Sequence, residues 1–513
     1  MSDGVRLATD VHLPASSGGP WPAILSRTPY NKDGDLVAKL EFVARGYAVV
    51  VQNVRGTGRS EGEWTLFGSD GWGGPGFRDG ADTVAWIRAQ SWSDGKVGAI
   101  GFSGSGIPAL MLTAAAPEGL LCTFANATSD NLYETFFPGG AYRVNTAETW
   151  PQAKPLLGEI AKHPTYDAYW ASRDARSRAA SSNVPVYLTW AWSDLFERSA
   201  TAFFRAMHRN GLERSEGRCK LVMAPGAHAA PPGDLTFPDR SGTNVDARVG
   251  SMYEWFDRWL KGVDNGIDEK PSVALFVMGA DTPGAGGNEW RFLDDWPPPA
   301  ASVDLYLRAG GRLTRERPVE PAGEASYRHD PASPIPTVGG ANLVPPSGPH
   351  DLRAVEGRPD VLVFETPPLE RNVTVIGPVT VTLQVSSDAP DTDFAAFLTD
   401  VYPDGRSMLF CDNLVRARRR NGDGADAFLE AGRVYEVSVD LWDACMVFAP
   451  GHRIRLVVGS SNWPRFDVNP NTGEAIGRHT RTAVAANAVH FSAEHASKLT
   501  LPLTDPGAAE ALP

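Results

Sequence analysis

A serine in a glycine-rich turn is the first candidate for chemistry in this sequence. Ser103 lies in "GFSGSG", residues 101–106, directly after the apolar run "KVGAI". In a nucleophile elbow a strand turns so sharply into a helix that the serine projects from the sheet, and the residues two before and two after it must be small. Gly101 and Ser105 meet this requirement. A flexible Gly/Ser turn without any chemistry fits the same letters.

A second and a third residue type are needed before that serine can react. A serine hydroxyl becomes a nucleophile when a base takes its proton and a carboxylate orients the base. Asp194 follows the apolar run "VPVYLTWAWS", and His228 follows "KLVMAPGA". The order Ser, Asp, His, each after a strand, is typical of α/β-hydrolases. The alternatives are a helix N-cap for Asp194, because "LFERSATAFF" comes next, and a turn histidine for His228.

The elements that would position these side chains alternate between strands and helices. Runs such as "WPAILSRTPY", "YAVVVQNVRG" and "KVGAIGFSGSG" are typical of buried strands, whereas "DLVAKLEFVARG" and "DGADTVAWIRAQSW" have apolar residues at helical spacing. Such alternation predicts a mostly parallel sheet covered on both faces, with its chemistry at the carboxyl ends of the strands. We assign residues 1–125 and 183–297 to this catalytic domain.

Residues 126–182 interrupt the alternation. The segments "NLYETFF", "AETWPQAKPLLGEIAKHP" and "YDAYWASRDARSRAA" have helical patterns, and no strand is evident among them. We therefore predict a short helical cap inserted over the sheet. Aromatic side chains in and near it are candidates for a substrate pocket, although packing alone explains most of them: Phe136, Phe137, Trp150, Trp170 and Trp192.

Strand patterns alone follow the proline cluster "WPPPA". Runs such as "VTVIGPVTVTLQVSS", "RVYEVSVDLW" and "HRIRLVVGSS" recur with Gly, Pro and Asp between them, which predicts a C-terminal β-sandwich, a jelly roll, over residues 298–513. Jelly rolls are also common binding modules, so a non-catalytic carbohydrate-binding protein is an alternative, with Trp442 and Trp463 as its platform.

Composition excludes several classes of partner. The 513 residues carry a formal net charge of −13, which argues against nucleic acid. No run of about 18 apolar residues would span a membrane, and the first residues lack a secretory signal pattern, so we expect a cytoplasmic protein without a membrane partner. No phosphate-binding loop or metal-ligand spacing is present, so we expect neither cofactor nor metal. The oligomeric state stays open, with a homodimer as one candidate.

Further motifs make the sequence similar to one family from end to end. In order, "RTPYNK", "VQNVRGTGRSEGEW", "GFSGSG", "WSDLF", "GAH", "WFDRWLKG" and "FAPGHRIRLVVGSSNWPRFDVNPNTG" resemble the α/β-hydrolases that include cocaine esterase, glutaryl acylases, α-amino-acid ester hydrolases and Xaa-Pro dipeptidyl-peptidases, also called CocE/NonD hydrolases. The resemblance implies a triad of Ser103, Asp194 and His228. It adds Tyr30 as a donor to the oxyanion hole, paired with the backbone N–H of Gly104.

Some positions depart from the pattern of that family. Gly104 stands where tyrosine is usual, which removes an aromatic wall of the acyl pocket, and Asn53 stands where aspartate is common. We expect a serine hydrolase that cleaves small carboxylic esters, or amides, through an acyl-enzyme. "GSGI" offers no carboxylate for an α-amino group, which favours esters, although Glu134 or Glu148 of the cap would be able to supply one. An acylase, an Xaa-Pro or α-amino-acid peptidase and an acyltransferase remain alternatives.

Overall fold

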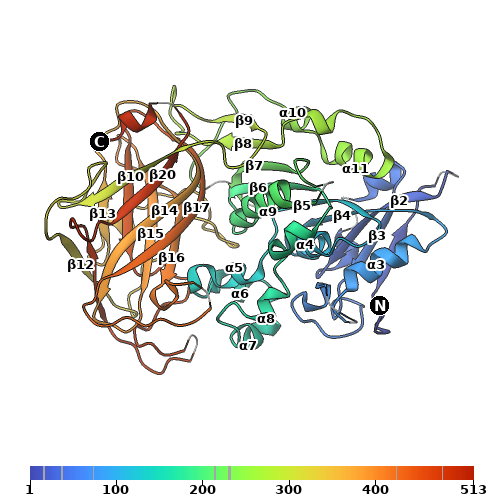
Figure 1. Ribbon diagram of the computed structural model, residues 1–513, viewed down its shortest axis with the longest axis horizontal. Coiled ribbons are helices and arrows are strands. Elements are labelled where there is room, and N and C mark those ends of the chain that lie inside the picture. The colour runs from blue at the N-terminus through green and yellow to red at the C-terminus, as the bar shows by residue number, and fades with distance from the viewer. Residues whose placement is uncertain are drawn as a thin grey trace.

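Two β-sheet assemblies organise the chain, and a group of short helices lies between them at one side (Figure 1). The computed structural model describes residues 1–15, 18–35, 39–72, 74, 76–212, 215–228, 233–422, 424–475, 478–505 and 507–513. None of the helices in these ranges is long and apolar enough to span a lipid bilayer.

The first sheet carries the catalytic candidates. Within the described residues it has nine strands in the order β1-β3-β2-β4-β5-β6-β7-β8-β9. Strands β2 to β8 run parallel, and the edge strands β1 and β9 are antiparallel to their neighbours. Their bounds are β1 Thr9–His12, β2 Trp21–Thr28, β3 Ala48–Asn53, β4 Ser93–Phe102, β5 Leu120–Asn126, β6 Val186–Ser193, β7 Lys220–Ala227, β8 Val273–Val277 and β9 Glu289–Leu293.

Helices cover both faces of this sheet, as the alternating pattern predicts. Ile24 and Val49 pack against α2 and α11 on one face, whereas their neighbours Leu25 and Val50 pack against α3 and α4 on the other. Successive strand residues point to opposite faces, so both faces need apolar cover. The helices are α1 Lys32–Asp35, α2 Leu40–Ala44, α3 Asp79–Arg88, α4 Gly106–Ala115, α9 Glu197–Asn210, α10 Val245–Val249 and α11 Met252–Lys261. Residues 36–38, near the start of the predicted helix "DLVAKLEFVARG", lie outside the described residues.

The segment between β5 and β6 forms the helices at the side of the molecule. These are α5 Leu132–Phe136, α6 Val144–Thr149, α7 Leu157–Ile160 and α8 Ala168–Ala171, together with short 3-10 turns. They are shorter than the sequence patterns indicate. Pro151 and Pro155 follow α6 closely, and proline lacks the N–H that would continue a helix. We propose residues 126–182 as the inserted cap.

The second assembly is mostly antiparallel and confirms the predicted β-sandwich. Its strands have the order β12-β19-β14-β20-β10-β11-β13-β18-β15-β16, with β17 paired to β14. Among the described strands of this second assembly, only β11 and β13 pair in parallel. The bounds are β10 Ala301–Arg308, β11 Arg312–Thr314, β12 Glu324–His329, β13 Leu362–Glu365, β14 Val373–Ser387, β15 Asp393–Val401, β16 Ser407–Arg416, β17 Tyr435–Phe448, β18 Arg453–Gly459, β19 Ala485–His490 and β20 Lys498–Leu503, with the helix α12 Arg353–Glu356 between β12 and β13.

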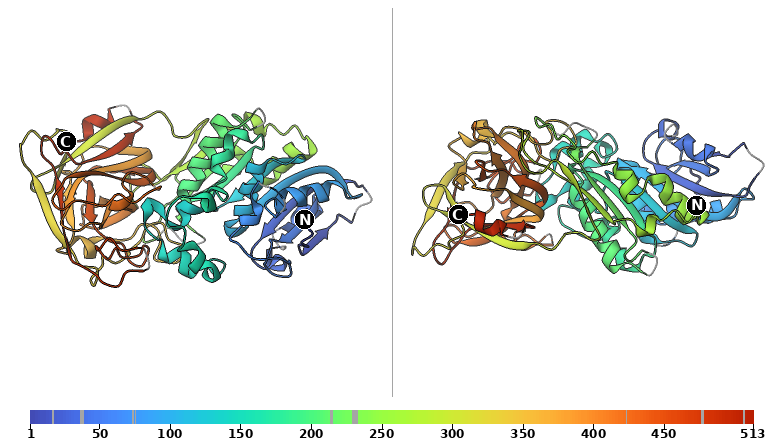
Figure 2. Two further views of the ribbon diagram at one scale, coloured as in Figure 1. Left: turned by 60° about the horizontal axis from the view of Figure 1, so that its bottom comes forward. Right: turned by 90° about the horizontal axis from the view of Figure 1, so that it is seen from above.

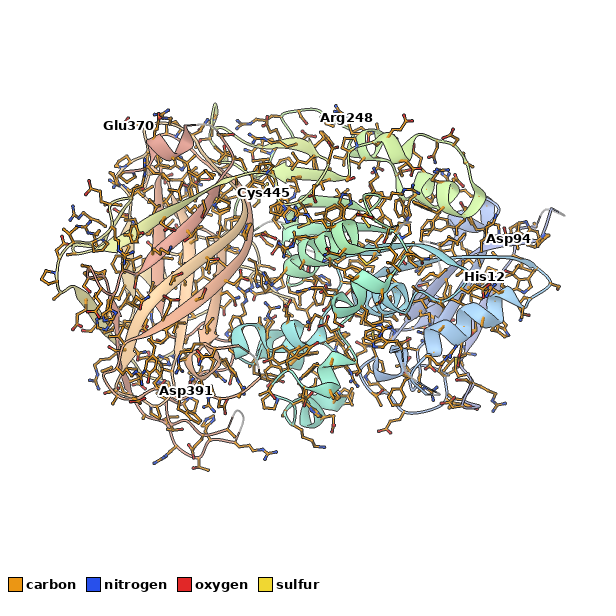
Figure 3. All side chains as sticks on the ribbon, viewed as in Figure 1. His12, Asp94, Arg248, Glu370, Asp391 and Cys445 are labelled. Carbon is orange, nitrogen blue, oxygen red and sulfur yellow. The ribbon has the colours of Figure 1, made fainter. Side chains whose placement is uncertain are left out.

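The two assemblies are joined by backbone hydrogen bonds as well as by packing. Met278, just after β8, donates its N–H to the carbonyl of Cys445 on β17 (3.0 Å), and Val447 donates to the carbonyl of Met278 (2.9 Å). Cys445 lies where β17 approaches the first sheet (Figure 3). Figure 2 shows the sandwich and the sheet side by side from two further directions. We propose the domain boundary near residue 298, in the segment between β9 and β10.

Candidate active site

Ser103 occupies the turn between β4 and α4. Strand β4 ends at Phe102, and α4 begins at Gly106 after one 3-10 turn. The φ of Ser103 is 53°, in the left-handed region that residues other than glycine seldom adopt. A Cβ on residue 101 would lie 2.2 Å from the carbonyl oxygen of Ser105, so only glycine fits there. Strained backbone at a tight strand-to-helix turn is the local geometry of a nucleophile elbow.

The structure brings the three triad candidates into one chain of contacts. Ser103 Oγ lies 3.0 Å from His228 Nε2, and His228 Nδ1 lies 3.0 Å from Asp194 Oδ2. An ionised carboxylate only accepts hydrogen bonds, so Nδ1 carries the hydrogen of the neutral imidazole. Nε2 is then left with a lone pair facing the hydroxyl of Ser103. This is the arrangement that a base needs to remove the proton of a serine.

Asp194 is held by a second contact on the protein side. Its side chain is fully buried, and its Oδ1 accepts the backbone N–H of Phe196 (2.8 Å) just ahead of α9. The helix N-cap position belongs to Phe196, so Asp194 is not the cap itself. With one oxygen fixed by the backbone, the other is aimed at the imidazole.

Tyr30 comes from the loop after β2, next to β4 in the sheet. Thr28 Oγ1 accepts hydrogen bonds from the backbone N–H of Tyr30 (3.1 Å) and from the hydroxyl of Ser105 (2.8 Å). Asn53 Nδ2 donates to the carbonyl of Tyr30 (2.6 Å). The serine at position 105 and the asparagine at position 53 therefore both tie the Tyr30 loop in place. Sequence reasoning noted Ser105 as a small residue of the turn and Asn53 as a departure from the family pattern, and it missed the contacts of both.

The hydroxyl of Tyr30 lies beside the backbone of Gly104. A Cβ on residue 104 would lie 2.5 Å from Tyr30 Oη and 3.2 Å from Cζ2 of Trp150. Trp150 Nε1 also donates a hydrogen bond to Tyr30 Oη (3.1 Å). The space next to the nucleophile turn is thus filled by a phenol and by an indole from the cap, and glycine at 104 is what makes room for them.

Two phenylalanines that the sequence analysis did not select contact the imidazole of His228. Phe102 stacks on it with ring centroids 5.5 Å apart, and Phe196 meets it edge-on at the same distance. Phe102 is exposed, so it forms the outer surface over the histidine. The sequence indicated these contacts only by position, since Phe102 directly precedes Ser103 and Phe196 lies two residues after Asp194.

Four of the five aromatic residues predicted for a pocket lie in one buried apolar cluster, and Trp192 lies apart from them. Trp150 contacts Tyr30, and Phe136 stacks behind Trp150 (6.3 Å). Trp170 is fully buried in the cap. Trp192 donates its indole N–H to a backbone carbonyl of β8 and packs between the two sheets. Phe137 meets the ring of Trp170 edge-on (6.0 Å) and also lines a cavity.

That cavity, of about 250 Å³, lies where the cap, the start of α9 and the sandwich meet. Its described lining includes Phe137, Phe196 and Trp442, and none of the three triad candidates. Glu134, also in the lining, accepts two hydrogen bonds from Arg176 (3.0 and 2.9 Å). Although burial works against ionisation, the nearby arginines keep the pKa of Glu134 below its ordinary value. This carboxylate is an occupied partner in an ion-pair network.

Comparison with known proteins identifies the family. The model of the X-Pro dipeptidyl-peptidase (S15 family) matches residues 3–157 and 151–230, and that of the X-Pro dipeptidyl-peptidase C-terminal non-catalytic domain matches residues 265–500. Cocaine esterase from Rhodococcus sp. (strain MB1 Bresler) is 34% identical, over 98% of this chain and 97% of its own length. The chain belongs to the S15 family of serine hydrolases.

Solved structures of similar fold agree with this membership. An aminopeptidase from the marine sediment archaeon Thaumarchaeota archaeon superposes with a TM-score of 0.83 at 25% identity, and an α-amino acid ester hydrolase superposes with a TM-score of 0.81 at 27% identity. Each comparison covers 98% of this chain and 95% of the other. The resemblance seen in the sequence motifs and the predicted pairing of an α/β-hydrolase domain with a β-sandwich are both confirmed. Within the described residues, no group of three or more His, Cys, Asp or Glu side chains would hold a metal ion.

Proposed function

We propose that this S15-family hydrolase is an esterase that cleaves carboxylic esters of small acyl groups through an acyl-enzyme. The observation that carries the proposal is the chain of contacts from Ser103 Oγ through the imidazole of His228 to the buried carboxylate of Asp194, with 3.0 Å at each step. A serine, a base and an orienting carboxylate within hydrogen-bond reach make up the machinery of acyl transfer to serine.

The reaction follows from this geometry. Ser103 Oγ attacks the carbonyl carbon of the ester while its proton passes to His228 Nε2, and Asp194 stabilises the imidazolium that forms. The hydroxyl of Tyr30 and the backbone N–H of Gly104 donate hydrogen bonds to the oxyanion. Collapse of this intermediate expels the alcohol, which takes its proton from His228. Water then attacks the acyl-enzyme by the same route and releases the acid.

Three observations favour esters over α-amino substrates. The carboxylate of Glu134, one of the two cap residues that the sequence offered to bind an amine, is engaged by Arg176. The residues directly after the nucleophile, Gly104 to Ile107, bring no charge to the turn. The relative at 34% identity is itself named an esterase. Glu148 is exposed on α6, and among the described residues no ion pair is found for it. It is the other cap carboxylate that the sequence offers for recognition of an amine.

Replacement of the nucleophile tests the proposal. Ser103→Ala should lower kcat on aryl esters by roughly 10⁴- to 10⁶-fold while leaving the thermal unfolding midpoint close to wild type. A fluorophosphonate probe should label the wild-type chain at Ser103 only. Ser93→Ala, at the opposite end of β4, is the matched control and should retain full activity and labelling. Retention of esterase activity by Ser103→Ala would contradict the proposal.

A substrate panel separates the alternatives. Wild type and Ser103→Ala would be assayed on aryl esters, β-lactam side-chain amides and Xaa-Pro anilides, with and without an added alcohol or amine nucleophile. We expect the highest kcat/KM on esters and free acid as the main product. Faster cleavage of the anilides would indicate a peptidase, and predominant transfer to the added nucleophile would indicate an acyltransferase.

A further inference from the structure

The indole of Trp150 makes a contact that neither the triad nor the oxyanion donors account for. Trp150 follows α6 in the cap, and its Nε1 lies 3.1 Å from Tyr30 Oη. The indole is buried and held by aromatic stacking on Phe67 and Phe136, with centroids 6.3 Å apart in both pairs. A buried ring that packs against two other rings has little freedom to turn, so the direction of its N–H is restricted.

That N–H determines where the hydrogen of the phenol points. An indole N–H only donates, so Tyr30 Oη must accept from Trp150 with one of its lone pairs. The hydroxyl hydrogen is then directed away from the indole. Among the described residues, none accepts a hydrogen bond from it, and the oxygen lies beside the backbone of Gly104. The donor is consequently free for a ligand at the nucleophile turn.

We propose that Trp150 is a positioning residue of the oxyanion hole, which acts by orienting and polarising the hydroxyl of Tyr30. This inference rests on the proposed roles of Ser103 and Tyr30. By donating to the phenol oxygen, the indole makes the phenol a stronger donor, since hydrogen bonds in a chain polarise one another. It also keeps the hydroxyl from rotating, so less reorganisation is needed when negative charge develops on the substrate.

Glycine at position 104 is needed for the same arrangement of Tyr30 and Trp150. Any side chain there would meet both Tyr30 Oη and the indole. Trp150 therefore supplies, from the cap, the aromatic surface that residue 104 lacks. Its hydrogen bond to Tyr30 Oη connects the cap to the oxyanion hole.

A double-mutant cycle tests the inference. Trp150→Phe keeps an aromatic ring and removes the N–H, whereas Tyr30→Phe removes the hydroxyl on which it acts. We expect Trp150→Phe to lower kcat on an aryl ester about 3- to 12-fold, the value of one hydrogen bond, with KM little changed. In the Tyr30→Phe background the same substitution should have no further effect on kcat. Equal losses in both backgrounds would mean that Trp150 acts only through packing, and would overturn the inference.

Two further variants guard against a loss of folding. Benzothienylalanine at position 150 keeps the bicyclic shape without an N–H and should reproduce the loss in kcat at an unchanged thermal midpoint. Trp64→Phe is the matched control: the indole of Trp64 donates to the carbonyl of Gln152, two residues after Trp150, and contacts Phe67. It removes a comparable bond to the same segment and should leave kcat unchanged.

The outcomes distinguish this inference from the proposed function. If Tyr30→Phe lowers kcat strongly while Trp150→Phe and the benzothienyl variant do not, only the role of Trp150 is wrong. If Tyr30→Phe leaves kcat unchanged while Ser103→Ala abolishes activity, the role of Tyr30 and the inference both fail and the triad stands. If Ser103→Ala retains activity, the proposed function itself is wrong.

Discussion

At the scale of single residues, the site depends on small side chains as much as on reactive ones. The hydroxyl of Ser103 reaches His228 because glycine at 101 allows the tight turn. The hydroxyl of Tyr30 reaches the same turn because residue 104 has no side chain. The triad types and their order were readable from the sequence. The contact between the phenol of Tyr30 and an indole 120 residues away was not.

Gly104→Ala is the sharpest test at this scale. The backbone of residue 104 is not in the left-handed region, so alanine brings only its methyl group, which would lie 2.5 Å from Tyr30 Oη. The phenol must move, and we expect kcat on aryl esters to fall about 10- to 100-fold as one oxyanion donor is displaced. Steady-state kinetics at matched thermal stability would measure this. Gly158→Ala, where an added Cβ meets nothing within 4 Å, should be silent; equal kinetics for both variants would contradict the geometry.

At the scale of elements, the ends of three strands position the triad candidates, and the first residue of helix α9 destabilises the fold. Ser103, Asp194 and His228 follow β4, β6 and β7, whose carboxyl ends share one edge of the parallel sheet. Immediately behind Asp194, α9 begins with Glu197, which is almost fully buried. Among the described residues, neither of its carboxylate oxygens has a hydrogen-bond partner. Burial, together with the nearby Asp443, raises the pKa of Glu197 well above its ordinary value.

Glu197→Gln should therefore stabilise the protein, and more so at higher pH. A carboxyl group whose pKa is raised by folding binds its proton more tightly in the folded state, so its contribution is intact below the ordinary pKa of glutamate and is lost as the pH rises above it. Glutamine stays neutral throughout. We expect a gain of about 1–3 kcal/mol in the free energy of unfolding at pH 8, and a smaller gain at pH 5.

Chemical denaturation at the two pH values would measure this difference. Glu370→Gln is the control, because Glu370 is exposed at the periphery of the sandwich (Figure 3). It should change stability at neither pH. An unchanged or lower stability of Glu197→Gln at pH 8 would show that the carboxylate has a favourable partner that the described contacts do not include.

At the scale of the whole molecule, the sandwich and the first sheet share one apolar core. One continuous apolar cluster extends from Trp192 and Phe276 of the first sheet to Met446 and Phe448 of β17. The cap is tied in as well, since Arg143 donates to the carbonyl of Leu195 and its guanidinium lies over the ring of Trp442 (5.1 Å). The loop of Asp194 is therefore contacted by the cap and by the sandwich at once.

Met446→Ala should reveal this coupling. Met446 is fully buried on β17, and it pairs with Met278 at the end of the first sheet. Truncation of such a side chain costs about 2–5 kcal/mol. We expect the midpoint for thermal loss of esterase activity to fall together with the midpoint for loss of β-structure by circular dichroism. If β-structure melts earlier while activity keeps its wild-type midpoint, the two domains are energetically independent.

The sequence by itself determined the fold class, the family and the order of the chemistry-bearing residues. Those properties depend on the periodicity of apolar residues and on motifs such as "GFSGSG", both of which involve residues close together in the sequence. The tertiary structure decided the rest: that Trp150 reaches Tyr30, that Ser105 shares Thr28 with the Tyr30 loop, and that Trp192 lies apart from the other four predicted pocket aromatics. The physical reason is that a hydrogen bond between residues far apart depends on how the cap packs on the sheet, and no spacing along the chain encodes that packing.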